Sequence, residues 1–205
     1  MASMLNQAEI QHKIKEFDPW YYEDLKFRTS LLLSSESFSH RIAELKHHVN
    51  TDPLTGLYNR RGMQLFLNEL VKTRTEFAAL SIDIDFFKKV NDHYGHDQGD
   101  MVLQTLAQIM QTNFRDHDIC CRSGGEEFLV LMTTADPSVA YKVAERLRTT
   151  MQQTNINGMG EITISIGIAF WFIDAEDISE VLKLADNKLY EAKHAGRNCT
   201  KSTAT

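Results

Sequence analysis

Residues 119–132, ICCRSGGEEFLVLM, decide the fold, because they read as two short strands joined by a turn. Gly124 and Gly125 stand where the two central residues of a tight hairpin are expected, and such residues often need positive φ. The turn needs the glycines, but it does not explain Glu126 and Glu127. Two adjacent like charges at the start of a core strand must meet a partner from elsewhere in the chain.

The segments around this hairpin alternate between helix and strand patterns. Residues 78–87, AALSIDIDFF, alternate in polarity, which predicts a strand with Asp83 and Asp85 on its polar side. A second β-branched, alternating run predicts a strand over 161–172, and the polar stretch 90–100 predicts a loop. Apolar residues at helical spacing predict helices over 61–71, 103–114, 139–151 and 178–195, with Gly196 as the C-terminal cap of the last. This order predicts an α/β domain with a central, mainly antiparallel sheet flanked by helices.

Composition narrows the class of protein. The chain has 205 residues, 42% of them hydrophobic and 24% charged, as is typical of a globular protein. Its net charge of −6 gives no basic field for long nucleic acid, so a phosphate-bearing ligand must be held locally. Three cysteines, two of them adjacent, suit a reducing compartment. With no membrane-length apolar stretch and no signal peptide, we expect a cytoplasmic domain, alone or within a longer, membrane-anchored receptor.

Residues 1–50 differ in pattern from residues 51–205, which predicts an N-terminal helical segment followed by one larger domain. The apolar positions of the first segment follow 7-4-3-4 spacing, at Leu31, Phe38, Ile42, Leu45 and Val49. Two interpretations carry equal weight. The helix either packs on its own domain or forms a dimerising stalk that brings two copies together.

Acidic side chains gather at the predicted ends of two strands. Asp83 and Asp85 belong to the first strand, and Glu126 and Glu127 begin another. One such acid is most often a solvated strand-end residue. Two pairs at neighbouring strand ends would repel, and a hard divalent cation resolves that conflict because Mg²⁺ prefers carboxylate oxygens and leaves room for phosphates. The two pairs therefore favour a metal site.

Basic and amide side chains fit a nucleotide beside that metal. Lys88 follows the first acidic pair, and Lys193 and Arg197 lie one helical turn apart. Each of these cations alone is more simply a surface charge. Asn91 and Asp100 offer the donors and acceptors that a guanine edge requires, since a carboxylate accepts from the ring N–H and the exocyclic amine.

Five ordered motifs carry a resemblance to a known family. They are DPLTGLYNRR (52–61), DIDFFKKVNDHYGHDQGD (83–100), RSGGEEF (122–128), SIGIA (165–169) and ADNKLYEAKHAGRN (185–198). Together they make residues 51–200 resemble the GGDEF family, the diguanylate cyclases. The sequence departs from the family's name only at Glu126, where a glutamate replaces an aspartate and keeps the carboxylate.

The resemblance implies a fold like the palm of nucleotidyl cyclases and polymerases. It also implies condensation of two GTP molecules into cyclic di-GMP, with release of two pyrophosphates, using Mg²⁺ or Mn²⁺. By resemblance, Asp83, Glu126 and the carbonyl of Ile84 hold the metal, while Glu126, Glu127 and Lys88 serve catalysis. The implied substrate-binding residues are Asn91, His96, Asp100, Lys193, Arg197, Gly124 and Gly125. Because the product is two-fold symmetric, two protomers must face each other, which implies a homodimer.

The resemblance also implies an inhibitory site for the product. Arg115 and Asp118 form an R-x-x-D pattern whose aspartate lies six residues before Gly124, and Arg146 stands at the position of an additional arginine. Planar, bidentate arginines suit the guanines and phosphates of cyclic di-GMP. The alternative is that Arg115 is simply a favourable cation at a helix end.

Two other functions compete with an active cyclase. The domain is alternatively a non-catalytic module that binds GTP or cyclic di-GMP and regulates a partner. The presence of Asp83, Glu126 and Glu127 favours the enzyme, because degenerate members of the family typically lose these carboxylates. A cyclase for a different nucleotide is disfavoured by Asn91 and Asp100, which match the guanine readers.

Overall fold

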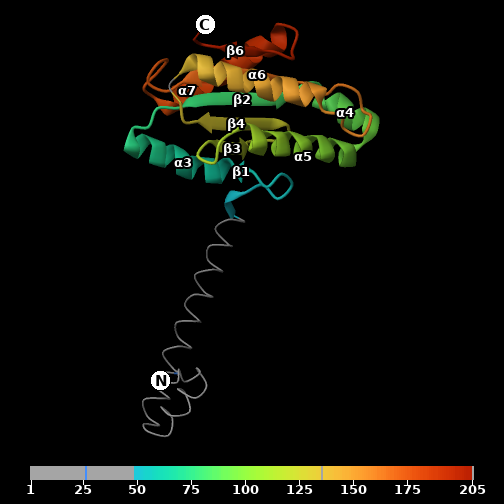
Figure 1. Ribbon diagram of the computed structural model, residues 1–205, viewed down its shortest axis with the longest axis horizontal. Helices are drawn as coiled ribbons and strands as arrows, with labels where there is room; N and C mark the ends of the chain where they lie inside the picture. Colours follow the sequence, from blue (N-terminus) through green and yellow to red (C-terminus); the bar gives the residue numbers. More distant parts are fainter. Residues whose placement is uncertain (1–25, 27–48, 135, 205) are drawn as a thin grey trace, which may run out of the picture. The chain divides into compact units, whose positions relative to one another are not determined.

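A computed structural model describes residue 26, residues 49–134 and residues 136–204. Of the apolar positions that predict the N-terminal helix, from Leu31 to Val49, only Val49 lies within the described residues. Six strands form one sheet in the order β1-β3-β4-β2-β5-β6, in the middle of the domain (Figure 1). The four central strands pair antiparallel, while the edge strands β1 and β6 each pair parallel to a neighbour. The predicted α/β fold with a mainly antiparallel centre is confirmed.

The predicted elements occur in the predicted order. The strands are β1 Tyr58–Asn59, β2 Ala78–Ile84, β3 Ile119–Arg122, β4 Glu127–Met132, β5 Ile164–Phe170 and β6 Thr200–Ser202. The helices are α3 Arg60–Thr73, α4 Phe87–Tyr94, α5 His96–Asn113, α6 Pro137–Gln153 and α7 Ile178–His194. Helices α3, α5 and α6 are longer than predicted, strands β2 and β5 are shorter, and α4, β1 and β6 are additional. The last helix ends as predicted, since Gly196 takes a φ of 111° just beyond it.

Each face of the sheet is covered by its own set of helices. On one face, α4, α5 and α6 bury a core that includes Leu80, Ile82 and Ile84 of β2. On the other face, α3 and α7 bury a second core around Met63 and Val181. Both faces of β2 are therefore covered, and all seven of its residues are buried.

The polar side of β2 is covered by α7 instead of water. The predicted alternation is correct, but the residues between the apolar ones meet side chains of this helix. Ser81 donates a hydrogen bond to Asp186 at 2.6 Å, and Asp83 forms an ion pair with Lys193 at 2.8 Å. A buried carboxylate requires such a partner.

Gly167 of β5 allows α7 to lie this close to the sheet. A Cβ at this position would lie 2.1 Å from both the Ala185 carbonyl oxygen and the Leu189 backbone nitrogen. Helix backbone and strand backbone are thus in direct contact. This contact brings the side chains of α7 within reach of β2, the strand next to β5.

The predicted loop over residues 90–100 is wrong. The stretch is almost entirely helical, because α4 and α5 meet at Gly95, which takes a φ of 85° and forms the only break. The polar residues that suggested a loop lie mostly on the exposed sides of these two helices, which are separated by a single residue. Strands β1 and β6 were also missed, because two and three residues are too few to show a period.

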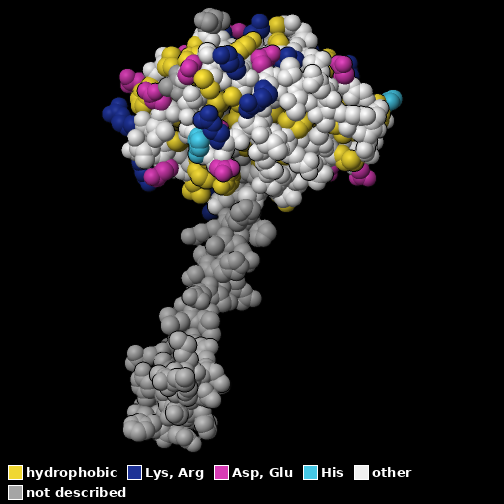
Figure 2. All heavy atoms as spheres, viewed as in Figure 1, with side chains coloured by type: hydrophobic (Ala, Val, Ile, Leu, Met, Phe, Trp, Pro, Cys, Tyr) yellow, Lys and Arg dark blue, Asp and Glu magenta, His cyan; other side chains and the backbone are white. Residues whose placement is uncertain are grey.

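The described surface carries charges of both signs. On the face seen in Figure 2, acidic and basic side chains are interspersed. Within the described ranges, no helix combines the length and the apolar character needed to cross a membrane.

The contact at Gly167 gives a test of the packing of α7. Gly167→Ala should lower the free energy of unfolding by about 1–3 kcal/mol, because the added methyl group overpacks against backbone that cannot move aside cheaply. Urea denaturation measures this change. The matched control is Gly125→Ala, whose new methyl group would meet nothing within 4 Å at a φ outside the left-handed region. Equal stability of the two variants would contradict the close contact.

Candidate active site

Asp83 is the centre of a group of charged residues at one end of the sheet. The residue lies at the end of β2, is only 4% exposed, and pairs in register with Glu127 of β4. Burial raises the pKa of Asp83 above its ordinary value, the bond with Lys193 acts against that rise, and the charges of Glu127 and Asp85 add to it. Lys193 is thus the neighbour that favours the charged form of this carboxyl.

Glu126 lies directly beside this aspartate. Its backbone carbonyl accepts a hydrogen bond from the backbone N–H of Ile84, which places the turn next to the end of β2. Partial burial raises the pKa of the Glu126 carboxyl, and the charge of Asp83 raises it further. Glu127 follows on β4 with its side chain exposed. The sequence-predicted carboxylates Asp83, Glu126 and Glu127 are thus brought together.

The two glycines of the turn act differently from the prediction. Four residues, Ser123–Glu126, connect β3 and β4, and neither glycine has positive φ. Gly124 is needed for space, because a Cβ there would lie 2.8 Å from the carboxylate of Glu127. A Cβ on Gly125 would meet nothing within 4 Å, so this residue presents bare backbone to open space. The expected tight two-residue turn is therefore wrong.

Arg122 holds the turn in place through hydrogen bonds. Its guanidinium donates to the Gly125 carbonyl oxygen at 2.8 and 3.1 Å and to the carboxylate of Asp52 at 3.1 Å. Asp52 in turn accepts from the backbone N–H and the hydroxyl of Thr55, within the short turn that precedes β1. Sequence reasoning missed this clamp, although both Asp52 and Arg122 stand at the starts of quoted motifs.

The start of α4 offers backbone donors next to the carboxylates. No side chain caps this helix, and the preceding residue, Phe86, is left-handed with a φ of 56°. The first N–H groups of a helix have no partner within the helix and carry partial positive charge, so they favour an anion. Lys88 lies exposed in this first turn. The Arg197 guanidinium lies 4.3 Å from the centre of the Phe86 ring, which places Arg197 beside the start of α4.

Asp85 has a structural role that the sequence did not reveal. It is buried, and its carboxylate accepts from the hydroxyls of Thr163 and Ser165 at 2.7 Å and from the backbone N–H of Asn198 at 3.0 Å. The predicted acidic cluster therefore includes one member that is already satisfied. Asp85 ties the end of β2 to β5 and to the loop after α7.

Asn91 holds a buried acceptor without a partner. Its Oδ1 forms no hydrogen bond with any described residue, and it faces Gly99 of α5, where a Cβ would lie 1.9 Å from it. Asp100 follows Gly99 and is exposed, and His96 lies exposed at the start of the same helix. The predicted guanine-reading residues thus come from two helices, with Asn91 one helical turn after Lys88 in α4 and Asp100 in α5.

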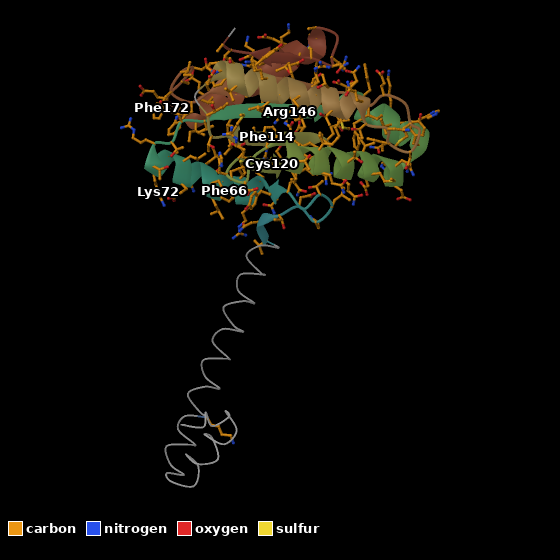
Figure 3. The ribbon with its side chains drawn as sticks, in the orientation of Figure 1. Phe66, Lys72, Phe114, Cys120, Arg146 and Phe172 are labelled. Carbon is orange, nitrogen blue, oxygen red and sulfur yellow. The ribbon has the colours of Figure 1, made fainter. Side chains whose placement is uncertain are left out.

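The predicted product site lies at the far end of α5. Asp118 accepts from the backbone N–H of Arg115 and from Thr133, so its carboxylate is occupied in holding the turn. The Arg115 side chain is exposed. Arg146 of α6, beside Phe114 in Figure 3, donates to the side-chain and backbone oxygens of Asn113 at 2.7 and 2.6 Å. These residues are separated from His96 by the 18 residues of α5, a length of about 27 Å.

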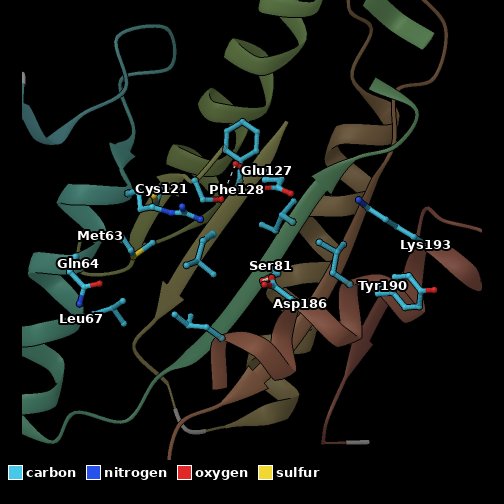
Figure 4. Close-up of a pocket in the computed structure, with 16 residues that line it drawn as sticks. Met63, Gln64, Leu67, Ser81, Cys121, Glu127, Phe128, Asp186, Tyr190 and Lys193 are labelled. Carbon is cyan, nitrogen blue, oxygen red and sulfur yellow. Dashed lines mark hydrogen bonds between the residues drawn. The ribbon is translucent and has the colours of Figure 1, made fainter. Parts of the chain in front are cut away.

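A groove of about 490 Å³ extends from the carboxylates between α3 and α7. Figure 4 shows Met63 and Leu67 on one side, Tyr190 and Lys193 on the other, and the strands β4 and β2 as the floor. The groove meets the site at Glu127 and Lys193 but does not include the Asn91 region. It therefore borders the site without containing it.

The donor set suits a cation that also takes ligands from a substrate. Within residues 49–134 and 136–204, no three His, Cys, Asp or Glu side chains already form a metal-binding group. Mg²⁺ usually takes one or two protein carboxylates and completes its shell with water and phosphate oxygens. Asp83 and Glu126 supply two such carboxylates, and the charge of Asp83 is close enough to raise the pKa of the Glu126 carboxyl.

A protein-family model described as "Diguanylate cyclase, GGDEF domain" matches residues 49–199. The chain is 45% identical over 157 residues to "Response regulator PleD" of Caulobacter vibrioides, and the match covers 72% of this chain and 35% of the relative. It is 38% identical over 158 residues to "Diguanylate cyclase A" of Treponema denticola, covering 76% of this chain and 41% of the relative. The chain thus spans about two fifths or less of the length of these relatives.

Solved structures give the same likeness. The crystal structure of the coiled coil and GGDEF domain of DgcB from Caulobacter crescentus in complex with c-di-GMP superposes with a TM-score of 0.77 and 26% identity. The match covers 87% of this chain and 99% of that one. The structure thus matches the palm-like fold that the sequence motifs predicted.

The Asp52–Arg122 clamp gives a pH-dependent test. Burial alone would raise the pKa of Asp52, but the hydrogen bonds from Thr55 and Arg122 outweigh it and hold the pKa below its ordinary value of 3.8. The unfolded chain therefore binds the proton more readily, so Asp52 contributes stability above its unfolded pKa that is lost as the pH falls through its folded pKa. Asp52→Asn should lower the free energy of unfolding by about 1 kcal/mol at pH 7.

This difference between Asp52→Asn and the natural protein should shrink as the pH falls below 3.8. Urea denaturation across pH 3–7 measures it, and the exposed Asp116 provides the matched control in Asp116→Asn. A difference that stays constant over this range would show that the charge of Asp52 is not what holds the turn.

Proposed function

Because the chain belongs to the GGDEF family of diguanylate cyclases, we propose that it condenses two GTP molecules into cyclic di-GMP and two pyrophosphates. One observation carries the proposal. A buried carboxylate, Asp83, lies 2.8 Å from Lys193 and beside the uncapped start of α4. Acidic and basic groups are thereby gathered where a triphosphate and its cation would lie together.

Four groups would bind the triphosphate. The free N–H groups at the start of α4 face the phosphates, and Lys88, Lys193 and Arg197 supply positive charge around them. Gly124 and Gly125 let the nucleotide approach the turn, since the second of these has open space where a side chain would be. Lys193 would leave Asp83 for a phosphate when the nucleotide binds.

The base would be read between α4 and α5. The unpartnered Oδ1 of Asn91 accepts from a guanine N–H, and Asp100 accepts from the ring N–H and the exocyclic amine. Adenine lacks these donors on the same edge. His96, at the start of α5, would contact the nucleoside.

Asp83, Glu126 and the carbonyl of Ile84 would hold Mg²⁺ or Mn²⁺. When bound, such a cation lowers the pKa of a coordinated hydroxyl and offsets phosphate charge. The protein's own groups do the rest. By the family resemblance, Glu126 would accept the proton of the 3′-hydroxyl, and Glu127 adds negative charge beside it. Lys88, with Lys193 and Arg197, offsets the charge that develops on the α-phosphate and the leaving pyrophosphate.

Each domain offers one half of this site. The reaction joins two nucleotides, so two protomers must present their sites to each other, which makes the working form a homodimer. The predicted stalk would raise the frequency of that encounter through effective concentration. Its residues, apart from residues 26, 49 and 50, lie in the part of the chain that the structure does not describe.

The direct test is product analysis by mass spectrometry after incubation with GTP and Mg²⁺. The natural protein should form cyclic di-GMP and pyrophosphate. Glu126→Gln should abolish synthesis, because it removes a metal charge and the proton acceptor while keeping the shape of the side chain. GTP binding without any product in the natural protein would favour the non-catalytic module, and full turnover by Glu126→Gln would contradict the role of this residue.

Gly99 gives a test of base selection. Gly99→Ala should preserve the helix, since alanine is the better helix former. Its methyl group would displace Asn91, leaving a guanine donor unpaired at a loss of about 1–3 kcal/mol. GTP should therefore bind roughly tenfold more weakly, while ATP binding changes little. Calorimetric titration with each nucleotide decides, and equal losses for both would mean that Gly99 acts only on the packing of α4 and α5.

We further propose that Arg115, Asp118 and Arg146 form an inhibitory site for the product. The exposed Arg115 side chain can contact a ligand. Arg146 lies at the same end of α5, where it donates a hydrogen bond to Asn113. A related GGDEF domain was crystallised in complex with c-di-GMP, which supports product binding on this fold. Asp118 holds the turn, so its replacement would disturb the backbone as well as the ligand.

Arg115→Ala is therefore the cleaner variant. It removes a charged hydrogen-bond donor to the product, which contributes about 1.5–3 kcal/mol, so inhibition should weaken roughly ten- to a hundredfold. Initial rates with fresh GTP should change little, because the GTP site lies at the other end of α5. Progress curves with added cyclic di-GMP measure both quantities. Inhibition as tight as that of the natural protein would leave Arg115 as a helix-end cation.

A further inference from the structure

Two left-handed segments meet at the edge of the site. Phe86 has a φ of 56°, and Arg197 and Asn198 have φ values of 67° and 46°. Residues other than glycine rarely adopt this conformation, and it persists only where the surroundings hold it. Such positions cluster at ligand sites. Here one segment precedes α4 and the other follows α7, so the two come from distant parts of the chain.

The Phe86 ring is in contact with cations. Its side chain is 51% exposed, so it does not belong to either core. The Arg197 guanidinium carbon lies 4.3 Å from the ring centre, and the Lys89 ammonium lies 4.4 Å from it. At these distances the electron-rich ring face attracts both charges, and each such contact at an exposed site changes an equilibrium constant by a factor of roughly two to five.

The backbone beside Arg197 is fixed separately. The backbone N–H of Asn198 donates to Asp85 at 3.0 Å, and its side-chain oxygen accepts from Arg148 of α6 at 2.7 Å. Asp85 is also the residue that precedes Phe86. The loop that carries Arg197 is thus joined to the residue before the ring, while the ring itself holds the end of the side chain.

We propose that Phe86 is a positioning residue whose ring holds Arg197 and Lys89 beside the start of α4, ready to bind the triphosphate. A guanidinium that lies over a ring keeps its N–H donors at its edges, where phosphate oxygens can reach them. Ordering the long side chain in advance reduces the entropy lost when the ligand binds. The inference rests on the proposed function only in naming GTP as the ligand.

The test compares Phe86→Leu, which removes the ring but keeps an apolar side chain, with Phe86→Tyr, which keeps the ring. Inorganic tripolyphosphate, titrated by calorimetry, probes binding without turnover, and steady-state rates with GTP give KM and kcat. Phe86→Leu should weaken tripolyphosphate binding and raise KM three- to tenfold, with kcat changed less than twofold. Phe86→Tyr should restore both values. In an Arg197→Ala background, Phe86→Leu should have a smaller effect than it has alone.

Phe172 offers a matched control. It is also a left-handed phenylalanine, with a φ of 70° and the Arg74 guanidinium 5.5 Å from its ring centre. It follows β5 at the end of the sheet opposite to Asp83, where Ala78 pairs with Phe170 (Figure 3). Phe172→Leu should leave tripolyphosphate binding unchanged.

Three results would overturn the proposal. Phe86→Leu could bind tripolyphosphate as tightly as the natural protein, or Phe86→Tyr could bind it as weakly as Phe86→Leu. The third is that the natural protein does not bind tripolyphosphate. The outcome is separable from that of the proposed function. Ring-dependent tripolyphosphate binding without formation of cyclic di-GMP would uphold the role of Phe86 and contradict the cyclase. Normal synthesis of cyclic di-GMP with an unchanged KM in Phe86→Leu would uphold the cyclase and contradict the role of Phe86.

Discussion

The buried carboxylate of Asp83 is the constraint on which the rest of the site depends. At the end of β2 it is almost fully removed from water, and an unpaired charge in such a place costs several kcal/mol. Lys193 meets it only because α7 packs directly on the backbone of β5 at Gly167. The close packing of one helix and the charge of one strand residue are therefore parts of a single arrangement.

The same arrangement suits a ligand that carries both signs of charge. A nucleotide with its cation would give Lys193 a phosphate and Asp83 a metal, so both charges would exchange partners and neither would be left alone. The neighbouring groups fit this exchange. Glu126 lies beside Ile84, the start of α4 has no cap, and Arg197 lies over the Phe86 ring. The placement of these charges therefore supports the proposed condensation of GTP.

Much of the fold could be predicted from local pattern. The alternation in residues 78–84 and the glycine after α7 gave correct elements, because both depend on neighbours in sequence. The loop expected over residues 90–100 was wrong, since polar residues on exposed helix faces resemble those of loops. The turn at Gly124 was also misjudged, because the need there is space beside Glu127 and not positive φ.

The partners of the site residues were beyond prediction from pattern. Nothing near Asp83 in sequence indicates Lys193, and nothing near Asp85 indicates Asn198. The most direct test of the partner exchange is calorimetric titration of a non-reacting GTP analogue with and without Mg²⁺, in the natural protein and in Asp83→Asn. Mg²⁺ should tighten binding at least roughly tenfold in the natural protein and have little effect in Asp83→Asn. An equal effect of Mg²⁺ in both proteins would contradict the role of Asp83 at the centre of the site.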